Sequence, residues 1–117
     1  MRRALKTGKD VPDAMSVSGL GGIDFLQGSP GVVHPTKNRL VKGSGVSHLV
    51  EQRNMEGVDG RRVALAMPRV IQRGERGAPY GPAGAQRMNI TLGEYTAVLS
   101  QHGSGRRGWW LLTGWKR

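Results

Sequence analysis

The fold class of this chain is decided by three runs of sequence near its C-terminus: RMNITL (87–92), YTAVLS (95–100) and WWLLTGW (109–115). The first run alternates polar and apolar residues, which is typical of a strand with one buried face. Glycine-containing breaks at 93–94 and 103–108 separate the runs and predict turns. The runs therefore predict an antiparallel meander, and the last one, apolar on both faces, is typical of an interior strand.

Two hydroxyl side chains in these strands are candidate site residues. Strict alternation would place Trp109, Leu111, Thr113 and Trp115 on one face of the last strand, and Trp110, Leu112 and Lys116 on the other. Thr113 is the polar residue of its face, so it is either a cross-strand hydrogen-bond partner or a site residue. Tyr95 either packs in the core or binds a phosphate or a base.

Upstream of the strands, GSGVSHLVEQR (43–53) predicts the start of a helix that carries a histidine. Ser44 and Ser47 are both competent N-caps. His48 would lie just inside the start, beside unpaired amide N–H groups and the positive end of the helix dipole, which suits a phosphate ester. The alternative is a capped helix with an incidental surface histidine.

Arg53 falls on the apolar side of this helix. A helix begun near Ser47 groups Arg53 with Val46, Leu49 and Val50, and groups His48 with Gln52 and Met55. Arg53 is therefore either a structural clamp on a carbonyl or carboxylate, or a cation held for a ligand phosphate. No acidic residue is an obvious partner for it. Because His48 and Arg53 lie about 140° apart around the helix, one substrate reaches both only by crossing the helix end.

A second short helix is predicted over residues 59–67. Asp59 is a plausible N-cap, and Pro68 interrupts the helix. The apolar pattern resumes after the proline and ends at Gly74, which fits a C-cap. Residues 75–86, rich in glycine and proline, are predicted to form a loop.

The remaining sequence sets the domain boundaries. Residues 23–26 predict a short strand or core anchor, whereas residues 1–22 predict a linker or a loosely ordered basic arm. The order of helices followed by strands predicts one α+β domain over 23–117, with N-terminal helices packed on one face of a C-terminal antiparallel sheet. The other face of the sheet would be free to meet a ligand.

The charge of the chain favours a polyanionic partner. Its 117 residues suit one domain, and eighteen Lys and Arg against eight Asp and Glu give a net charge of +10. No apolar run approaches the roughly 20 residues of a membrane span, and no amphipathic stretch pairs a Lys-rich face with a broad apolar one, so nucleic acid is favoured over a membrane. The alternative is a basic surface kept for solubility or for an acidic protein partner.

Metal chemistry is not indicated by the sequence. There is no cysteine, the histidines at 34, 48 and 102 lack metal-ligand spacing, and the eight acidic residues form no close pair suited to Mg²⁺. We therefore expect metal-free chemistry without a cofactor. The basic N-terminus lacks the apolar core of a signal peptide, so we expect a cytoplasmic protein or a fragment of a larger one.

Five segments in order carry a resemblance to a known family: GIDFLQG (22–28), GVSHLVEQR (45–53), MPRVIQRG (67–74), YTAVL (95–99) and WLLT (110–113). Together they resemble the phage and polymorphic-toxin branch of the barnase, EndoU, colicin and RelE-like (BECR) nucleases. Such domains occur at the C-termini of phage head-morphogenesis proteins and of contact-dependent growth-inhibition toxins. The resemblance implies a BECR-like α+β fold, ribonuclease activity without metal and, for a toxin, a cognate immunity protein.

The resemblance also implies roles for single residues. The family's helix-borne histidine corresponds to His48, the basic residue five positions on to Arg53, and the hydroxyl residue of the last tryptophan-containing strand to Thr113. The chain departs from the family in having Gln27 where many members carry an aromatic residue, and in its Gly/Pro-rich loop at 77–84. The loop would alter substrate choice.

These observations predict a metal-independent endoribonuclease in which the RNA 2′-hydroxyl attacks the adjacent phosphate, leaving 2′,3′-cyclic phosphate and 5′-hydroxyl ends. His48 would act as general acid or base, and Arg53, helped by Lys42 or Arg87, would stabilise the phosphorane. Thr113 and Tyr95 would hold the phosphate by hydrogen bonds. The predicted RNA-binding residues are Lys42, Arg73, Arg87, Arg106 and Arg107.

The expected partners are RNA, with tRNA favoured, and an acidic immunity protein; no membrane is involved and the unbound domain would be a monomer. It would act in the cytoplasm of a target bacterium, delivered as the C-terminal part of a larger secreted or phage-borne protein. Two alternatives are a non-catalytic nucleic-acid-binding module, which the charge and tryptophans support equally, and a phage-head structural domain whose basic face meets packaged DNA.

Overall fold

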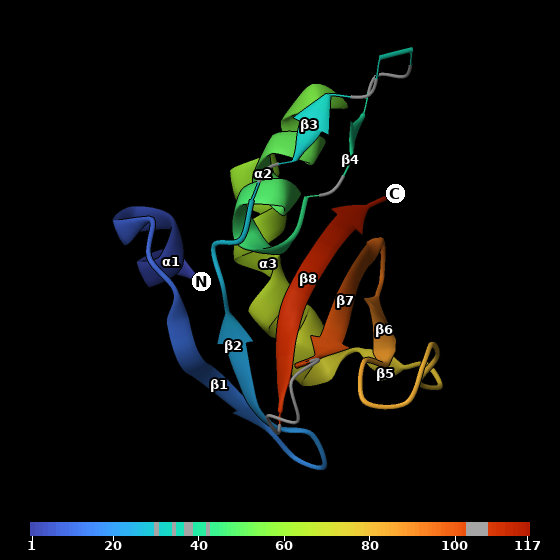
Figure 1. The fold of residues 1–117 in the computed structure, drawn as a ribbon. Helices are drawn as coiled ribbons and strands as arrows, with labels where there is room; N and C mark the ends of the chain where they lie inside the picture. The colour runs from blue at the N-terminus through green and yellow to red at the C-terminus, as the bar shows by residue number, and fades with distance from the viewer. Residues whose placement is uncertain (30, 34, 37–38, 42, 103–107) are drawn as a thin grey trace.

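The computed structural model describes residues 1–29, 31–33, 35–36, 39–41, 43–102 and 108–117. Its helices and strands, in chain order, are α1 (Arg2–Thr7), β1 (Val11–Val17), β2 (Gly21–Phe25), β3 (Val32–Val33), β4 (Leu40–Val41), α2 (Gly45–Met55), α3 (Gly60–Arg73), β5 (Glu75–Arg76), β6 (Arg87–Leu92), β7 (Tyr95–Gln101) and β8 (Trp109–Lys116). The predicted α+β class is confirmed, since helices and a six-stranded sheet share one core (Figure 1).

The sheet has the strand order β1-β2-β8-β7-β6-β5, and β8 lies in its interior as predicted. The meander is confirmed, because β6, β7 and β8 pair antiparallel in sequence. The sheet is nevertheless mixed rather than purely antiparallel, because β2 pairs with β8 in parallel through Ile23 with Trp109 and Asp24 with Trp110. A parallel pair needs a long connection, and the rest of the chain between β2 and β8 supplies it.

The first 22 residues are not the loose arm that the sequence predicted. They form α1 and β1, and β1 pairs antiparallel with β2 from Val17 opposite Gly21. Ala4 is fully buried, and the Gln27 side chain donates hydrogen bonds to the carbonyls of Ala4 (2.9 Å) and Lys9 (3.0 Å). The segment contributes only a few apolar side chains to the core, too few to show a period in the sequence.

The second predicted helix is longer than expected. α3 runs without a break through Pro68 and ends before Gly74, whose N–H binds the Val70 carbonyl. The predicted cap is confirmed, since the Asp59 side chain accepts a hydrogen bond from the Arg62 N–H at 3.2 Å. A proline inside a helix removes one backbone hydrogen bond, but here the same apolar stripe continues on both sides of it. Burial of that stripe stabilises the helix. The buried residues of the stripe are Val63, Ala64, Met67, Val70 and Ile71.

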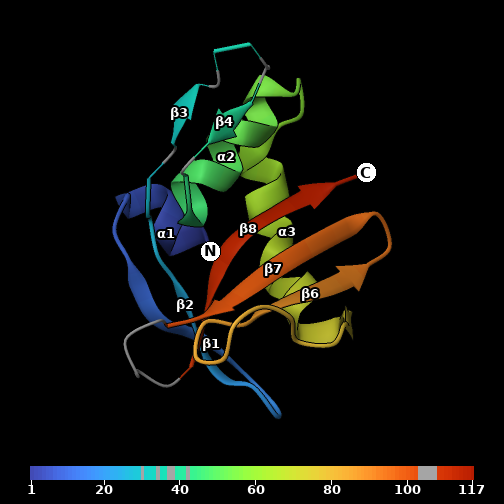
Figure 2. The same ribbon diagram turned by 45° about the vertical axis from the view of Figure 1, so that its right-hand side comes forward.

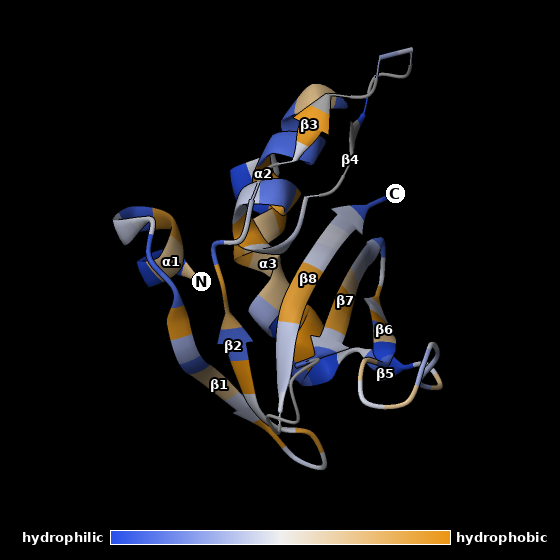
Figure 3. Cartoon of the chain, viewed as in Figure 1, coloured by the Kyte–Doolittle hydropathy of each residue, from blue (hydrophilic) through white to orange (hydrophobic). Residues whose placement is uncertain are grey.

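The core is formed by one face of the sheet, by α3, which lies across that face (Figure 2), and by buried residues of α2 and α1. Orange, apolar segments lie on β2, β7, β8 and α3, and also on β1 and on β3, where Val32 is exposed (Figure 3). Two glycines permit close approach of the elements. A side chain at Gly114 would collide with the Met67 sulfur on α3, and one at Gly60 would collide with the Val50 carbonyl on α2.

A β-bulge in β8 overturns the predicted division of its side chains. Leu111 lies opposite Leu99, whereas Thr113 lies opposite Val98, so Leu112 is an extra residue in the register. A bulge changes which face the following residues occupy. Thr113 and Trp115 therefore share the face of Trp110, opposite to the buried Leu111. We call this the outer face of the sheet, the one turned away from α3.

None of the helices among the described residues is both long and apolar enough to cross a membrane.

Candidate active site

The start of α2 is held by the chain segment that follows β2. The N–H groups of Val46 and Ser47 bind the carbonyls of Leu26 and Gln27, each at 2.9 Å, and the Ser44 side chain makes no capping hydrogen bond. The sequence predicted unpaired amides here as an anion site. Two of them are instead used by the protein's own backbone, a long-range pairing that local sequence does not reveal.

His48 lies in the first turn of α2 and is half-buried. The buried side of the same helix carries Val46, Leu49 and Arg53. His48 and Arg53 lie five residues apart, which is about 7.5 Å along the helix axis. Their side chains diverge by about 140° around that axis, so the helix does not aim both at one point.

Both terminal nitrogens of the Arg53 guanidinium donate hydrogen bonds. Its Nη1 donates to the Gly114 carbonyl on β8 at 2.8 Å, and its Nη2 donates to Glu56 Oε2 at 3.0 Å. The Arg53 side chain is 9% exposed and the Glu56 side chain 42%. Burial lowers the pKa of Arg53, and the charge of Glu56 and its hydrogen bond oppose that shift.

The expectation that Arg53 has no acidic partner was therefore wrong. Glu56 lies three residues further on, directly after α2, and an acidic residue at that spacing is a signal available in the sequence. The contacts of Arg53 are those of the structural clamp, one of the two roles that sequence analysis left open.

Thr113 has an unusual environment on the outer face. Among the described residues, two buried side-chain polar atoms lack a hydrogen-bond partner, Thr113 Oγ1 and Arg53 Nε. Thr113 immediately precedes Gly114, whose carbonyl Arg53 binds, so Thr113 is next in sequence to the contact between α2 and β8. The cross-strand hydrogen bond that was one alternative for Thr113 is not formed within the described residues.

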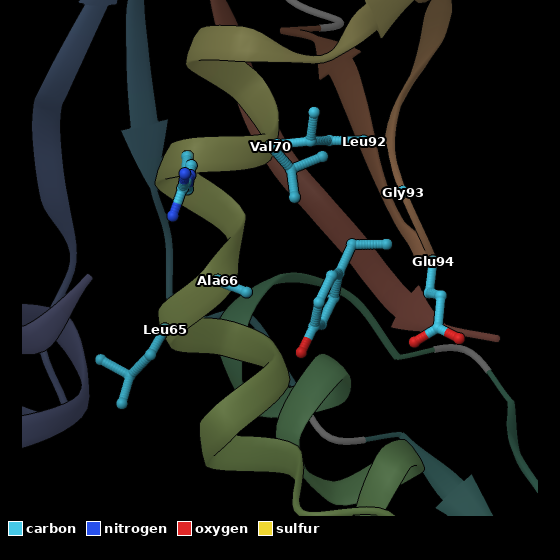
Figure 4. Close-up of a pocket in the computed structure, with 8 residues that line it drawn as sticks. Leu65, Ala66, Val70, Leu92, Gly93 and Glu94 are labelled. Carbon is cyan, nitrogen blue, oxygen red and sulfur yellow. The ribbon is translucent and has the colours of Figure 1, made fainter.

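Tyr95 lies on the opposite face of the sheet from Thr113. It pairs with Lys116 and packs against the core beside α3. It also lines a groove with Leu65 and Glu94 (Figure 4). The prediction that Tyr95 and Thr113 hold one phosphate is therefore wrong, because alternation along β7 and the bulge in β8 place them on different faces.

The predicted RNA-binding residues are dispersed. Arg87 lies opposite Ser100 and is exposed on the outer face. Arg73 is the exposed last residue of α3. Lys42, Arg106 and Arg107 lie outside the described residues.

Sequence analysis missed a pair that the structure brings together. His102 Nε2 lies 2.9 Å from Asp24 Oδ2, and the two side chains are 11% and 7% exposed. The other oxygen, Asp24 Oδ1, accepts a hydrogen bond from the Asp13 N–H at 2.8 Å. The residues are 78 positions apart, and the one local signal was a carboxylate inside the apolar run of β2.

Strand register extends this pair into a row on the outer face. Asp24 lies opposite Trp110, Trp110 opposite Ser100, and Ser100 opposite Arg87. Directly opposed residues share a face of the sheet, so these four side chains follow one another across β2, β8, β7 and β6.

The part of the chain that the structure describes contains no group of three or more His, Asp or Glu side chains arranged to hold a metal ion. Comparisons with protein-family models, with curated proteins and with solved structures find no match to this chain. Function is therefore inferred from the chemistry and geometry of the chain's own side chains.

Proposed function

We propose that this chain is a metal-independent endoribonuclease domain of BECR-like fold. It would cleave RNA by attack of a 2′-hydroxyl on the adjacent phosphorus, which forms the 2′,3′-cyclic phosphate and releases the 5′-oxygen. The observation that carries the proposal is the contact between α2 and β8, where the helix bearing His48 is anchored beside Thr113 by Arg53. Residues 61 positions apart in the sequence meet there.

Each residue has a role in this proposal that its environment supports. His48 transfers a proton, because imidazole both accepts and donates protons near neutral pH. Arg53 holds α2 on β8, since its buried guanidinium already binds Gly114 and Glu56. The negative charge of the RNA backbone is met by exposed arginine, with Arg87 on the outer face as the described candidate.

Thr113 contributes a hydroxyl without a partner among the described residues. Buried hydroxyl groups are ordinarily hydrogen-bonded, so an unpaired one in a strand is unfavourable unless it serves a ligand. Because Oγ1 is itself buried, contact with a phosphate requires rotation about the Cα–Cβ bond to another staggered rotamer.

The proposal includes the biological setting that the resemblance implies. The net charge of +10 suits a polyanionic substrate such as tRNA, and an acidic immunity protein would be electrostatically complementary to the same surface. The domain would act in the cytoplasm of a target bacterium after delivery by a larger secreted or phage-borne protein.

The test is incubation of the purified domain with total RNA in EDTA, followed by mapping of the cleaved ends. We expect cleavage with cyclic phosphate and 5′-hydroxyl ends, and its loss in His48→Ala with a melting temperature near that of the wild type. Glu51→Ala, an exposed change on the same helix, is the matched control and should cleave normally. RNA binding without cleavage would instead support a non-catalytic nucleic-acid-binding module.

A further inference from the structure

We infer that the outer face of the sheet carries the RNA, and that His102, oriented by Asp24, is a catalytic residue that takes the proton of the attacking 2′-hydroxyl. Trp110 would stack on a base of the same strand, and Arg87 would bind a neighbouring phosphate. This inference rests on the proposed ribonuclease function, to which it adds the substrate path and a second imidazole.

The geometry of the Asp24 and His102 pair suits proton transfer. An ionised carboxylate only accepts hydrogen bonds, so Nε2 of His102 carries the hydrogen in the 2.9 Å contact. The neutral ring then has its lone pair on Nδ1. This atom forms no hydrogen bond within the described residues and is not among their buried unpaired atoms. A carboxylate that holds one ring nitrogen while the other faces a substrate is the arrangement by which enzymes orient a histidine base.

Asp24 is itself fixed, which a positioning residue requires. Its side chain is 7% exposed, and Oδ1 accepts the Asp13 N–H while Oδ2 faces His102. The carboxylate therefore has hydrogen bonds on both oxygens. A rigidly held carboxylate sets the orientation of the imidazole more closely than a solvated one does.

Trp110 stands next to this pair and is available to a base. It lies directly opposite Asp24 in the strand register and is half-buried. Trp109, its neighbour, packs against the core, whereas Trp110 does not. An aromatic side chain on a strand face is a platform on which a base of single-stranded nucleic acid can stack.

The row ends at Arg87, three strands away from Asp24. Neighbouring strands lie about 4.8 Å apart, so the row from Asp24 to Arg87 spans about 14 Å. Between them, Ser100 is buried and donates its hydroxyl to the Gln101 carbonyl at 3.2 Å, so it does not serve as a nucleophile. The proton acceptor beside Asp24, the stacking side chain of Trp110 and the phosphate-binding side chain of Arg87 therefore follow one another across the sheet.

The first turn of α2 is held by the segment that follows β2, the strand that carries Asp24. Ser47, the residue before His48, binds the carbonyl of Gln27, which is three residues after Asp24. In the reaction, the 2′-oxygen forms a bond to phosphorus and its proton passes to His102 Nδ1. The bond from phosphorus to the 5′-oxygen breaks, and that oxygen takes a proton from the imidazolium of His48. Solvent then takes the proton from His102 and returns a proton to His48.

The decisive experiment measures single-turnover cleavage of a short single-stranded RNA by the full chain with His102→Gln. The glutamine amide can still donate to Asp24 Oδ2 but cannot accept a proton, so we expect the rate constant to fall by about 10²–10⁴-fold with the affinity retained. His102→Ala and Asp24→Asn extend the series, and urea unfolding confirms that each variant is folded. Wild-type rates in a folded His102→Gln or His102→Ala variant would overturn the inference.

Substrate placement is tested separately by binding. Trp110→Ala should raise the Kd for the RNA about tenfold or more, Trp110→Phe should restore most of the affinity, and Arg87→Ala should weaken binding. Arg61→Ala, an equal loss of charge at an exposed position on α3, is the matched control and should bind more tightly than Arg87→Ala. Equal affinities for Trp110→Ala and the wild type would overturn the outer face as the path.

The two proposals fail in different ways. Cleavage by the wild type together with unchanged His102→Gln would refute this inference and leave the ribonuclease function intact. Absence of cleavage by the wild type on every RNA tested would refute the ribonuclease function, and the role of His102 with it.

Discussion

Replacement of Arg53 by lysine separates the two roles open to this residue. Lysine keeps the positive charge and most of the aliphatic stem, but a single ammonium group does not reproduce the planar fork that reaches both Gly114 and Glu56. If Arg53 is the clamp between α2 and β8, Arg53→Lys destabilises the fold and leaves the chemistry of each folded molecule unchanged.

The size of the effect follows from the two partners. The hydrogen bond from the guanidinium to the buried Gly114 carbonyl is charge-assisted, and such bonds contribute about 1.5–3 kcal/mol. Glu56 is 42% exposed, so water screens the ion pair and its loss costs about 0–1 kcal/mol. We expect Arg53→Lys to lower the free energy of unfolding by about 2 kcal/mol, which is about 8 °C in Tm for a domain of this size.

The assay is urea unfolding followed by tryptophan fluorescence, with single-turnover cleavage measured on the same preparation. Glu56→Gln is the matched control: it keeps an oxygen acceptor but removes the charge, so it should cost less than about 1 kcal/mol. Turnover per folded molecule should stay within about threefold of the wild type for both variants, as expected for residues that do not touch the substrate.

Two results would refute this reasoning. A fall in turnover by orders of magnitude with unchanged stability would show that Arg53 stabilises charge on the substrate. A loss of stability in Glu56→Gln as large as that in Arg53→Lys would show that the ion pair, rather than the carbonyl contact, holds α2 in place.

Four further predictions follow from the same structure. Thr113→Val removes a buried hydroxyl without a described partner, so stability in urea should be unchanged or higher by up to about 1 kcal/mol while cleavage falls; a clear loss of stability would reveal a structural hydrogen bond. Gln27→Ala removes two hydrogen bonds to the N-terminal segment, so it should cost about 1–2 kcal/mol and speed proteolysis before residue 11; an unchanged digestion pattern would contradict the tether. Cleavage measured by gel should persist in EDTA, and absolute dependence on Mg²⁺ would refute the metal-independent mechanism. RNA affinity measured by fluorescence anisotropy should fall linearly with added salt on logarithmic axes; a flat dependence would exclude a phosphate-contacting interface.

The amino-acid sequence by itself determined the elements whose signals are local. The alternation in β6, the turn between β6 and β7, and the Asp59 cap of α3 each depend on residues within one hairpin or one helical turn. These features were predicted correctly because the backbone responds to its immediate neighbours. The net charge of +10, which needs no structure, is the ground for the proposal of a polyanionic partner.

Tertiary structure alone decided the features that join distant segments. Asp24 meets His102, Arg53 meets Gly114, and β2 lies parallel to β8, each across more than sixty residues of sequence. No local period encodes such pairings, since they depend on strand order and on the register between strands. The bulge at Leu112 shows the same limit within one strand: a single extra residue, selected by pairing with β7, moved Thr113 to the outer face.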